Sequence, residues 1–293
     1  MVDPGVSIIT DITFITAHFQ DFDWIKSWVK RIVQFTDYNL IRELLIINQD
    51  RNSKSRAKLQ ALDPKVRVLE YPVNQKYFDK QGHDHAYVLN LATEEAQGQF
   101  VCIMDSDCHP FSSDWIKGCE TRLQENDAVA AVDYYQLKNN SNLLTHPCFL
   151  LINRTNLDFT LSFDQDLFDH NMDTGRLIGK QLELAGRKVS YVVPKKAFRT
   201  YWGFIYIDSI YHHERGSYAK GDARLQKQID WRQNFFKRIV IKYCRYDFNN
   251  IEWLYFRFRF LKQSSFHKTL KTISAIPKRT LSKIRQLFNF KNT

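Results

Sequence analysis

Long apolar runs are absent from this chain of 293 residues. No stretch reaches the about 18 consecutive apolar residues that a transmembrane helix needs, so we expect no segment that spans a membrane. The N-terminus also lacks a basic stretch followed by a short apolar one, which is the pattern of a secretory signal peptide. These absences favour a cytoplasmic protein.

Cysteine pairs with the spacing of a metal or redox centre are absent too. The chain holds five Cys, none of them in a C-x-x-C pair, and two of them lie in or beside apolar runs. We interpret all five as reduced thiols with structural roles, which fits the cytosol. His146 likewise has no ligand spacing, so we interpret it as structural.

Acidic residues are scarce at the C-terminal end. Residues 231–293 contain 15 Lys or Arg and 2 Asp or Glu, a net charge of +13 in a chain whose total is +10, so the other 230 residues carry −3. Aromatic residues alternate with cations at 256–260 (FRFRF). We expect residues 222–293 to be a basic, aromatic, helical region, which is typical of peripheral contact with an anionic membrane surface.

Two other interpretations of this basic region stay open. Aromatic residues interleaved with cations also bind single-stranded nucleic acid. No RRM, KH or helix-turn-helix signature accompanies them, so nucleic acid is the less favoured partner. The region would otherwise be a helical appendage that packs on the preceding domain.

The order of apolar segments predicts an α/β fold. Runs typical of strands buried on both faces lie at 12–16, 44–48, 66–71, 100–104, 128–133, 148–152 and 189–193. Segments with helical spacing of apolar residues lie at 23–35, 84–97, 114–125 and 173–185. Gly98 and Gly186 follow two of these helices at positions that favour a left-handed residue. We therefore expect a mixed, mostly parallel sheet with helices on both faces.

One acidic triplet lies at the edge of this sheet where ligands bind. The chain has three D-x-D triplets, and about two are expected by chance. Only Asp105-Ser106-Asp107 follows a buried strand, so its two carboxylates would point to one side beyond the strand end. Like charges placed together favour a bound cation, and oxygen ligands suit Mg²⁺ or Mn²⁺ completed by diphosphate. The alternative is a structural Asx turn before Pro110.

The residues before this pair keep a fixed spacing. Gly82 is followed by Asn90 after eight residues, by Gly98 after another eight, and by Asp105 after seven more. In this register the chain resembles glycosyltransferase family 2, most clearly over residues 8–115. The resemblance implies a GT-A fold, a nucleotide-sugar donor, Mn²⁺ or Mg²⁺ as cofactor, and an inverting displacement without a covalent intermediate. A GT-A domain would then span 1–221, with its nucleotide-binding half at 1–107 and its acceptor half at 108–221.

The resemblance also assigns residues to the donor. Thr16, Ala17 and His18 at the first strand end would touch the nucleotide. Asn48 stands where the family usually has an acidic residue for the base, with Asp50 close by.

The resemblance implies further donor contacts within the segment from Gly82 to Asp107. Leu89 stands where the family often has Arg, and His83 or His85 would supply the missing cation. The positions expected to contact the donor are Gly82, His85, Asn90, Asp105 and Ser106.

The catalytic base expected from the resemblance is a carboxylate at the start of a helix in the acceptor half. Asp173 fits this position and would take the proton of the acceptor hydroxyl. A helix N-cap is the structural alternative, and Asp164, Asp166 and Asp169 are rivals for the catalytic role.

A histidine pair follows the last strand-like segment. His212 and His213 are candidates for the third metal ligand that members of this fold often have. Arg215 would add a contact to phosphate. A solvated loop with one packed histidine is the alternative.

Two rival functions stay open beside glycosyl transfer to a cell-surface glycan or a lipid-linked saccharide. A nucleotidyltransferase usually has a glycine-rich, cation-bearing loop after the first strand, whereas residues 17–21 contain neither. A non-catalytic membrane or nucleic-acid binder on a transferase scaffold would show no metal-dependent turnover.

Overall fold

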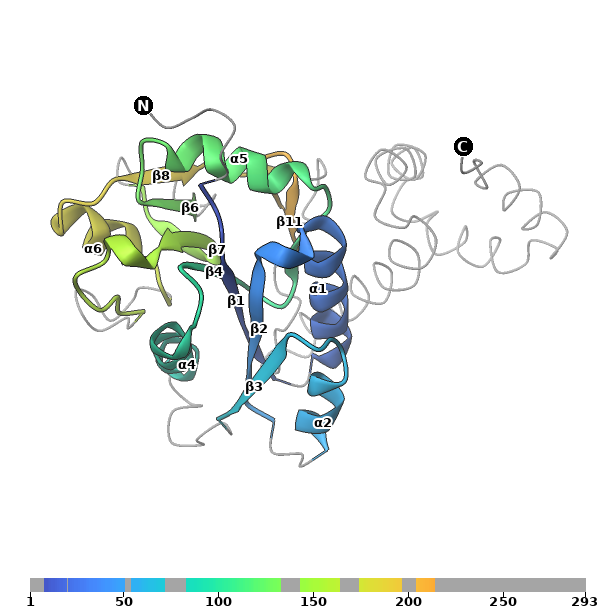
Figure 1. Cartoon of the computed structure of the whole chain (residues 1–293). Coiled ribbons are helices and arrows are strands. Elements are labelled where there is room, and N and C mark those ends of the chain that lie inside the picture. The colour runs from blue at the N-terminus through green and yellow to red at the C-terminus, as the bar shows by residue number, and fades with distance from the viewer. Residues whose placement is uncertain are drawn as a thin grey trace, which may run out of the picture. The chain divides into compact units, whose positions relative to one another are not determined.

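The computed structural model describes residues 8–19, 21–50, 54–71, 83–132, 143–163, 174–196 and 204–213 (Figure 1). The chain divides into two units, Met1–Trp231 and Arg232–Thr293, and every described residue belongs to the first. The boundary predicted at residues 221 and 222, and the basic region after it, lie outside the described residues.

A seven-stranded sheet forms the centre of the first unit, with the order β3-β2-β1-β4-β7-β6-β8. β1, β2, β3 and β4 run parallel, whereas β7 runs antiparallel to both of its neighbours. The strands are β1 Ile12–His18, β2 Ile41–Asn48, β3 Val66–Glu70, β4 Phe100–Met104, β6 Ala128–Val132, β7 Thr145–Asn153 and β8 Val189–Val192. All seven predicted strands are present, and the predicted mixed, mostly parallel sheet is confirmed.

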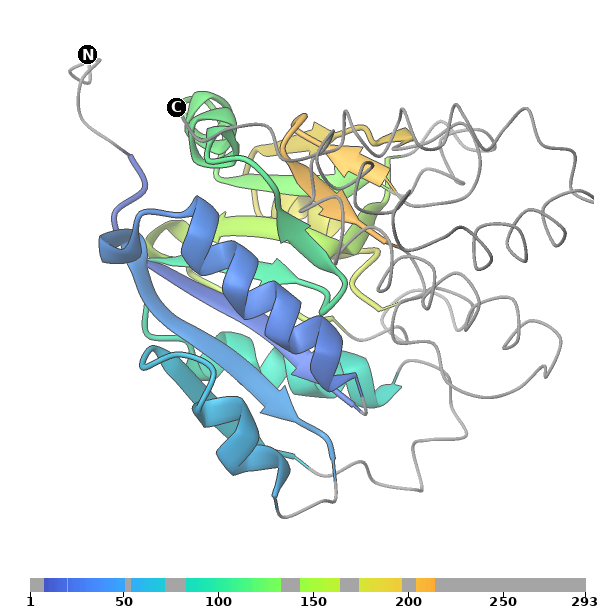
Figure 2. The same ribbon diagram turned by 90° about the vertical axis from the view of Figure 1, so that its right-hand side faces the viewer.

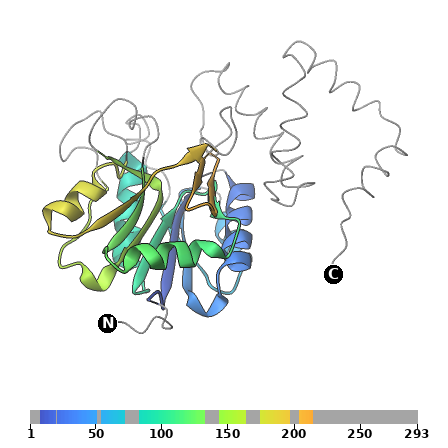
Figure 3. The same ribbon diagram turned by 90° about the horizontal axis from the view of Figure 1, so that it is seen from above.

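Helices cover both faces of this sheet (Figures 2 and 3). Because side chains alternate along a strand, Phe14 and Leu44 pack with α1, α2 and α5 on one face. Their neighbours Ile15 and Leu45 pack with α4 and α6 on the other. The helices are α1 Phe22–Phe35, α2 Ser55–Gln60, α4 His83–Glu95, α5 Asp114–Leu123 and α6 Ile178–Leu184.

Two helix ends differ from the predictions. The helix predicted at 173–185 begins only at Ile178, after turns at 174–177 in which Gly175 has a φ of +68°. Gly186 follows it with a φ of +75°, as the prediction of a left-handed C-terminal glycine requires. Helix α4 ends at Glu95 rather than near 97, and Gly98 lacks a positive φ. A Cβ at Gly98 would lie 2.6 Å from the Thr13 backbone nitrogen, so this glycine permits a close approach to β1.

A second, antiparallel sheet was not predicted. It has the order β5-β11-β10-β9, and its strands are β5 Cys108–Pro110, β9 Lys195–Lys196, β10 Phe204–Tyr206 and β11 Ile210–His212. These strands have two or three residues each, too few for a periodic pattern. Since β5 follows the D-x-D triplet directly and pairs with β11, this small sheet brings a late part of the chain to the end of β4.

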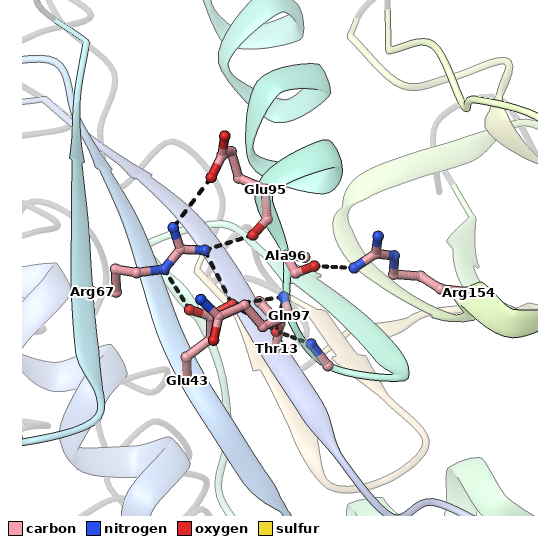
Figure 4. Close-up of polar contacts among 8 residues, drawn as sticks. Thr13, Glu43, Arg67, Glu95, Ala96, Gln97 and Arg154 are labelled. Atoms are coloured by element: carbon pink, nitrogen blue, oxygen red, sulfur yellow. Dashed lines mark hydrogen bonds and ion pairs between the residues drawn. The ribbon is translucent and has the colours of Figure 1, made fainter.

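A buried carboxylate ties the strands together at the amino end of the sheet (Figure 4). Glu43 on β2 accepts hydrogen bonds from Thr13 Oγ1 at 3.0 Å, Arg67 Nε at 2.6 Å and the Gln97 backbone N–H at 2.9 Å. Arg67 also donates to the Glu95 carbonyl at 2.6 Å, which satisfies an otherwise open group at the end of α4. This network fixes the turn from α4 into β4.

The four described cysteines are buried and free, in agreement with the interpretation of reduced thiols. Within the described ranges, no helix has the length and apolar character to cross a membrane.

Candidate active site

The two carboxylates of the D-x-D triplet lie where β4 ends and β5 begins. The Asp105 backbone N–H donates to the Cys148 carbonyl at 3.2 Å, and the Cys108 N–H donates to the Asp105 carbonyl at 2.8 Å, closing a tight turn. The Asp105 side chain is 24% exposed and that of Asp107 only 4%. One carboxylate is therefore mostly buried but partly open to solvent, while its neighbour is held inside the protein.

His212 reaches both carboxylates from β11. Its Nε2 lies 3.8 Å from Asp105 Oδ2 and 3.5 Å from Asp107 Oδ1. The register explains this placement, because His212 pairs with Cys108 on β5. Ligand atoms of Asp105, Asp107 and His212 all lie within 4.8 Å of one another, so the three can hold one divalent cation.

Neighbouring histidines and burial shift the pKa values of this cluster in opposite directions. Burial raises the pKa of Asp105, and the nearby His85 and His212 lower it in part. Burial disfavours protonation of His212, but Cys148 and Asp107 together hold its pKa well above its usual value. A bound cation would favour ionised carboxylates and a neutral imidazole instead.

His213, the second histidine predicted as a metal ligand, points elsewhere. Its Nδ1 lies 2.9 Å from the Tyr211 hydroxyl, and its ring lies against Trp24 at a centroid distance of 4.9 Å. Its backbone N–H donates to the Asp107 carbonyl at 3.0 Å. Neighbouring residues on a strand point to opposite sides, so His212 and His213 do not share one site.

His18, predicted to contact the nucleotide, is buried between two carboxylates. Its Nδ1 lies 2.5 Å from Asp21 Oδ1 and its Nε2 lies 3.3 Å from Asp50 Oδ2. The second oxygen of Asp21 accepts a short hydrogen bond from Ser106 Oγ. The ring of His18 therefore supports the ends of β1 and β2, and the donor contact of Thr16, Ala17 and His18 stays a prediction.

Asn48 is also occupied by protein contacts. Its Nδ2 donates to both oxygens of Glu70, at 3.2 and 3.0 Å, and its Oδ1 accepts from the Asp50 N–H at 3.2 Å and from Ser55 Oγ at 3.3 Å. The side chain is fully buried. Asp50, whose side chain is 19% exposed, is thus the more accessible of the two predicted base contacts.

Helix α4 contributes two of the predicted donor positions. His85 is 35% exposed, and its Nε2 lies 4.0 Å from Asp105 Oδ1. Asn90 Oδ1 accepts a 2.8 Å hydrogen bond from the Phe163 backbone N–H, which ties the helix to the segment after β7. His85 therefore faces the carboxylate cluster, whereas Asn90 has a structural bond.

Three predicted site residues lie outside the described residues: Gly82, Asp173 and Arg215. Helix α6 begins at Ile178 with Leu177 as its cap residue.

Sequence reasoning missed two residues beside the cluster. His146 and Cys148 on β7 lie with His212 so that one ligand atom of each is within 4.8 Å of the others. From the sequence alone, both residues are predicted to be structural. The available signal was their spacing of two within an apolar segment, which places both side chains on one side of a strand.

Comparison with known families decides the assignment suggested by this geometry. The profile of "Glycosyl transferase family 2" matches residues 13–178, more than half of the chain. The chain belongs to glycosyltransferase family 2. The predicted family is therefore confirmed, and the GT-A type of mixed sheet expected of this glycosyltransferase is the one observed. No curated protein matches the sequence.

Solved structures show distant similarity to this glycosyltransferase. A mannosyltransferase from Pyrobaculum calidifontis, solved with GDP-mannose and Mn²⁺, is 16% identical with a TM-score of 0.47, covering 61% of this chain and 54% of its own. TarS of S. aureus is 12% identical with a TM-score of 0.47 and coverages of 78% and 72%. Glucosyl-3-phosphoglycerate synthase from Mycobacterium tuberculosis, solved with Mn²⁺ and UDP, is 15% identical with a TM-score of 0.43 and coverages of 63% and 70%.

Proposed function

We propose that this protein is an inverting, metal-dependent glycosyltransferase that moves a sugar from a nucleotide-sugar donor to an acceptor hydroxyl. The observation that carries the proposal is the convergence of Asp105, Asp107 and His212 at the carboxyl end of the sheet in a family 2 chain. Ligands of open α/β sheets bind at this edge.

The three converging residues would hold the cation. Carboxylate oxygens suit both Mg²⁺ and Mn²⁺, and the imidazole favours Mn²⁺, because Mg²⁺ is held mainly by oxygen ligands. When bound, the cation would offset the negative charge of the nucleoside diphosphate. Asp105 is the partly exposed carboxylate and faces the donor, whereas Asp107 is held in place by its burial.

Residues around the cluster would position the donor. Thr16, Ala17 and Asp50 lie at the ends of β1 and β2, where the base and ribose of a nucleotide would lie. His85, on the solvent side of Asp105, would replace the cation that Leu89 does not supply. Gly82 and Arg215 are proposed to contact the diphosphate.

Asp173 remains the proposed catalytic base. Its carboxylate would take the proton of the acceptor hydroxyl while that oxygen attacks the anomeric carbon and the nucleoside diphosphate leaves. One displacement of this kind inverts the configuration at the anomeric carbon. The anomeric coupling constant of the first-formed product, measured by NMR, checks the inversion, and a retained configuration would contradict it.

Donor binding provides the direct test. Isothermal titration of the full chain with UDP, GDP, CDP and ADP, each with and without Mn²⁺, should show one nucleotide whose binding requires the metal. Asp107→Asn should abolish that binding. Asp208→Asn is the matched control. It is the same substitution, made at an exposed residue in the turn before β11 of the small sheet. Absence of metal-dependent binding for every nucleotide would overturn the proposal.

The role of Asp173 needs a separate measurement. Asp173→Asn should keep metal-dependent nucleotide binding and lose at least about 10²-fold in kcat, because it removes a general base. The same change at Asp164, Asp166 or Asp169 should have a much smaller effect. If one of these three variants loses more activity than Asp173→Asn, the base is that residue instead.

For the acceptor, we propose a cell-surface glycan or lipid-linked saccharide reached by peripheral contact of residues 222–293 with an anionic membrane. The net charge of +13 over residues 231–293 supports this contact. The full chain should sediment with vesicles rich in phosphatidylglycerol at low salt and be released at high salt. Equal binding to neutral vesicles, or none to either, would contradict it.

A further inference from the structure

A nitrogen and sulfur cluster lies next to the carboxylate pair. His146 and Cys148 occupy alternate positions of β7, so their side chains lie on one side of the strand. His212 approaches them from β11, with its ring centroid 5.3 Å from that of His146. One ligand atom from each of the three residues lies within 4.8 Å of the others.

The strand pairing fixes the cluster in place. The antiparallel register of β4 and β7 ends with Met104 opposite Phe149. The next bond runs from the Asp105 N–H to the Cys148 carbonyl at 3.2 Å, so Cys148 lies beside the first carboxylate. The cluster therefore adjoins the carboxylate pair and shares His212 with it.

Two of the three residues are buried, His146 is half-buried, and one buried atom has no hydrogen-bond partner. Cys148 is fully buried, and His212 is 4% exposed. The Nε2 of His212 faces the carboxylates, whereas its buried Nδ1 makes no hydrogen bond. A buried polar atom normally has a hydrogen-bond partner, so an unmet nitrogen beside a thiol and a second imidazole points to a missing ligand.

We propose that His146, Cys148 and His212 form a second cation site, selective for Zn²⁺, which shares His212 with the Asp105–Asp107 site. Thiolate sulfur and imidazole nitrogen are the ligands that Zn²⁺ takes, whereas Mg²⁺ and Mn²⁺ prefer oxygen. Tetrahedral Zn²⁺ places such atoms about 3.5 Å apart, from bond lengths of about 2.0 to 2.3 Å, so a small contraction of the cluster suffices.

The proton and charge balance of binding is simple. Cys148 binds as the thiolate and both imidazoles bind as neutral rings, so every proton that these three groups carry in the metal-free protein passes to solvent. His146 Nδ1 accepts a 3.2 Å hydrogen bond from the Cys148 backbone N–H, a long bond that a cation at this nitrogen would displace. Asp105 or a water molecule completes the four ligands.

The shared histidine makes the two sites compete. A Zn²⁺ ion on Nδ1 of His212 places a second positive charge on the ring whose Nε2 faces the carboxylates, so Zn²⁺ would weaken the Mn²⁺-dependent binding of nucleotide. This consequence rests on the proposed function, whereas the binding of Zn²⁺ itself does not.

Cobalt spectroscopy of the full chain tests the site directly. Co²⁺ replaces Zn²⁺ in such sites and gives a thiolate-to-metal charge-transfer band in the near ultraviolet. The wild type should develop this band up to one equivalent of Co²⁺ and lose it when Zn²⁺ is added. Cys148→Ser should abolish the band, and Cys119→Ser, a buried cysteine on α5, should keep it. The proposal is overturned if the wild type gives no band or Cys148→Ser retains it.

A second variant keeps the proposal testable if Cys148→Ser does not fold. His146→Gln keeps the thiol and should weaken Co²⁺ binding at least about tenfold, as loss of a ligand does. Unchanged affinity in a folded His146→Gln variant would also overturn the proposal.

The outcomes separate this proposal from the transferase function. A cobalt band without any nucleotide binding would support the cation site and count against the proposed activity. Metal-dependent nucleotide binding without a cobalt band would do the reverse. In a wild type that shows both, added Zn²⁺ should raise the Kd of the nucleotide at fixed Mn²⁺, and an unchanged Kd would refute the sharing of His212.

Discussion

The carboxylates at the two ends of the central sheet differ in their surroundings. At the amino end, Glu43 is buried and accepts hydrogen bonds from Thr13, Arg67 and Gln97 (Figure 4). At the carboxyl end, Asp105 and Asp107 lie together, with His212 no closer than 3.5 Å. The first carboxylate stabilises the fold, whereas the pair at the other end, with His212 beside it, is the proposed cation site. Substitutions at the two ends should therefore separate stability from activity.

The largest effect is expected for Asp107→Asn. Sugar transfer should fall about 10³-fold, close to 4 kcal/mol of transition-state stabilisation. The melting temperature of the metal-free protein should change little, because relief of the repulsion with Asp105 offsets the weakened contact with His212. Activity assays and scanning calorimetry measure both quantities. A marked loss of stability would show that this end is structural as well.

Glu43→Gln should give the opposite result. Loss of the buried charge leaves Arg67, which is 29% exposed, without its main partner, so the free energy of unfolding should fall by about 2 to 3 kcal/mol. Urea unfolding measures it. Glu95→Gln is the control, since Glu95 is 51% exposed and lies 3.4 Å from the same arginine; it should cost less than about 0.5 kcal/mol. Equal costs for the two variants would contradict the special role of Glu43.

Gly98→Ala should show a somewhat smaller loss. The new Cβ would lie 2.6 Å from the Thr13 backbone nitrogen and 3.0 Å from the Asp11 carbonyl oxygen. The turn between α4 and β4 must therefore move away from the backbone of residues 11–13, at a cost of about 1 to 3 kcal/mol. Gly186→Asn, in open space with a left-handed backbone, should cost less than about 1 kcal/mol. Chemical denaturation measures the loss of unfolding free energy in both variants. A larger loss for Gly186→Asn would show that the left-handed backbone at Gly186 matters more than the close approach at Gly98.

The smallest effect is expected for Asn48→Asp, which introduces the acidic residue usual for the family. Its carboxylate would face Glu70 in place of the amide that now donates to it, and the free energy of unfolding should fall by about 1 kcal/mol. Adding Glu70→Gln should restore it, and a double-mutant cycle measures the coupling. Additive effects would show that the two side chains do not interact.

The sequence was sufficient to predict the parts of the fold that local patterns encode. Strands such as 100–104 are buried on both faces and therefore appear as continuous apolar runs, and Asp105 could be placed because it follows one of them. The small second sheet could not be predicted, because strands as short as Lys195–Lys196 carry no periodicity. Without it, nothing indicated which histidine of the pair would reach the carboxylates.

Polar partners that are distant in the chain were also beyond sequence reasoning. Glu43 and Arg67 are separated by 24 residues, and Asn48 and Glu70 by 22, so only the strand register brings them together. His18 was predicted to touch the donor from its position at a strand end. Its burial between Asp21 and Asp50 depends on two further loops, which no spacing rule anticipates.

The late position of His212 sets the order in which the domain matures. The large described sheet is complete once β8 has been synthesised, but the carboxylate pair receives its histidine only when β11 follows. A nascent chain leaving the ribosome can thus fold most of its core before it is able to capture a cation. Under the proposed function, the ability to bind the cation is therefore acquired only after most of the core has formed.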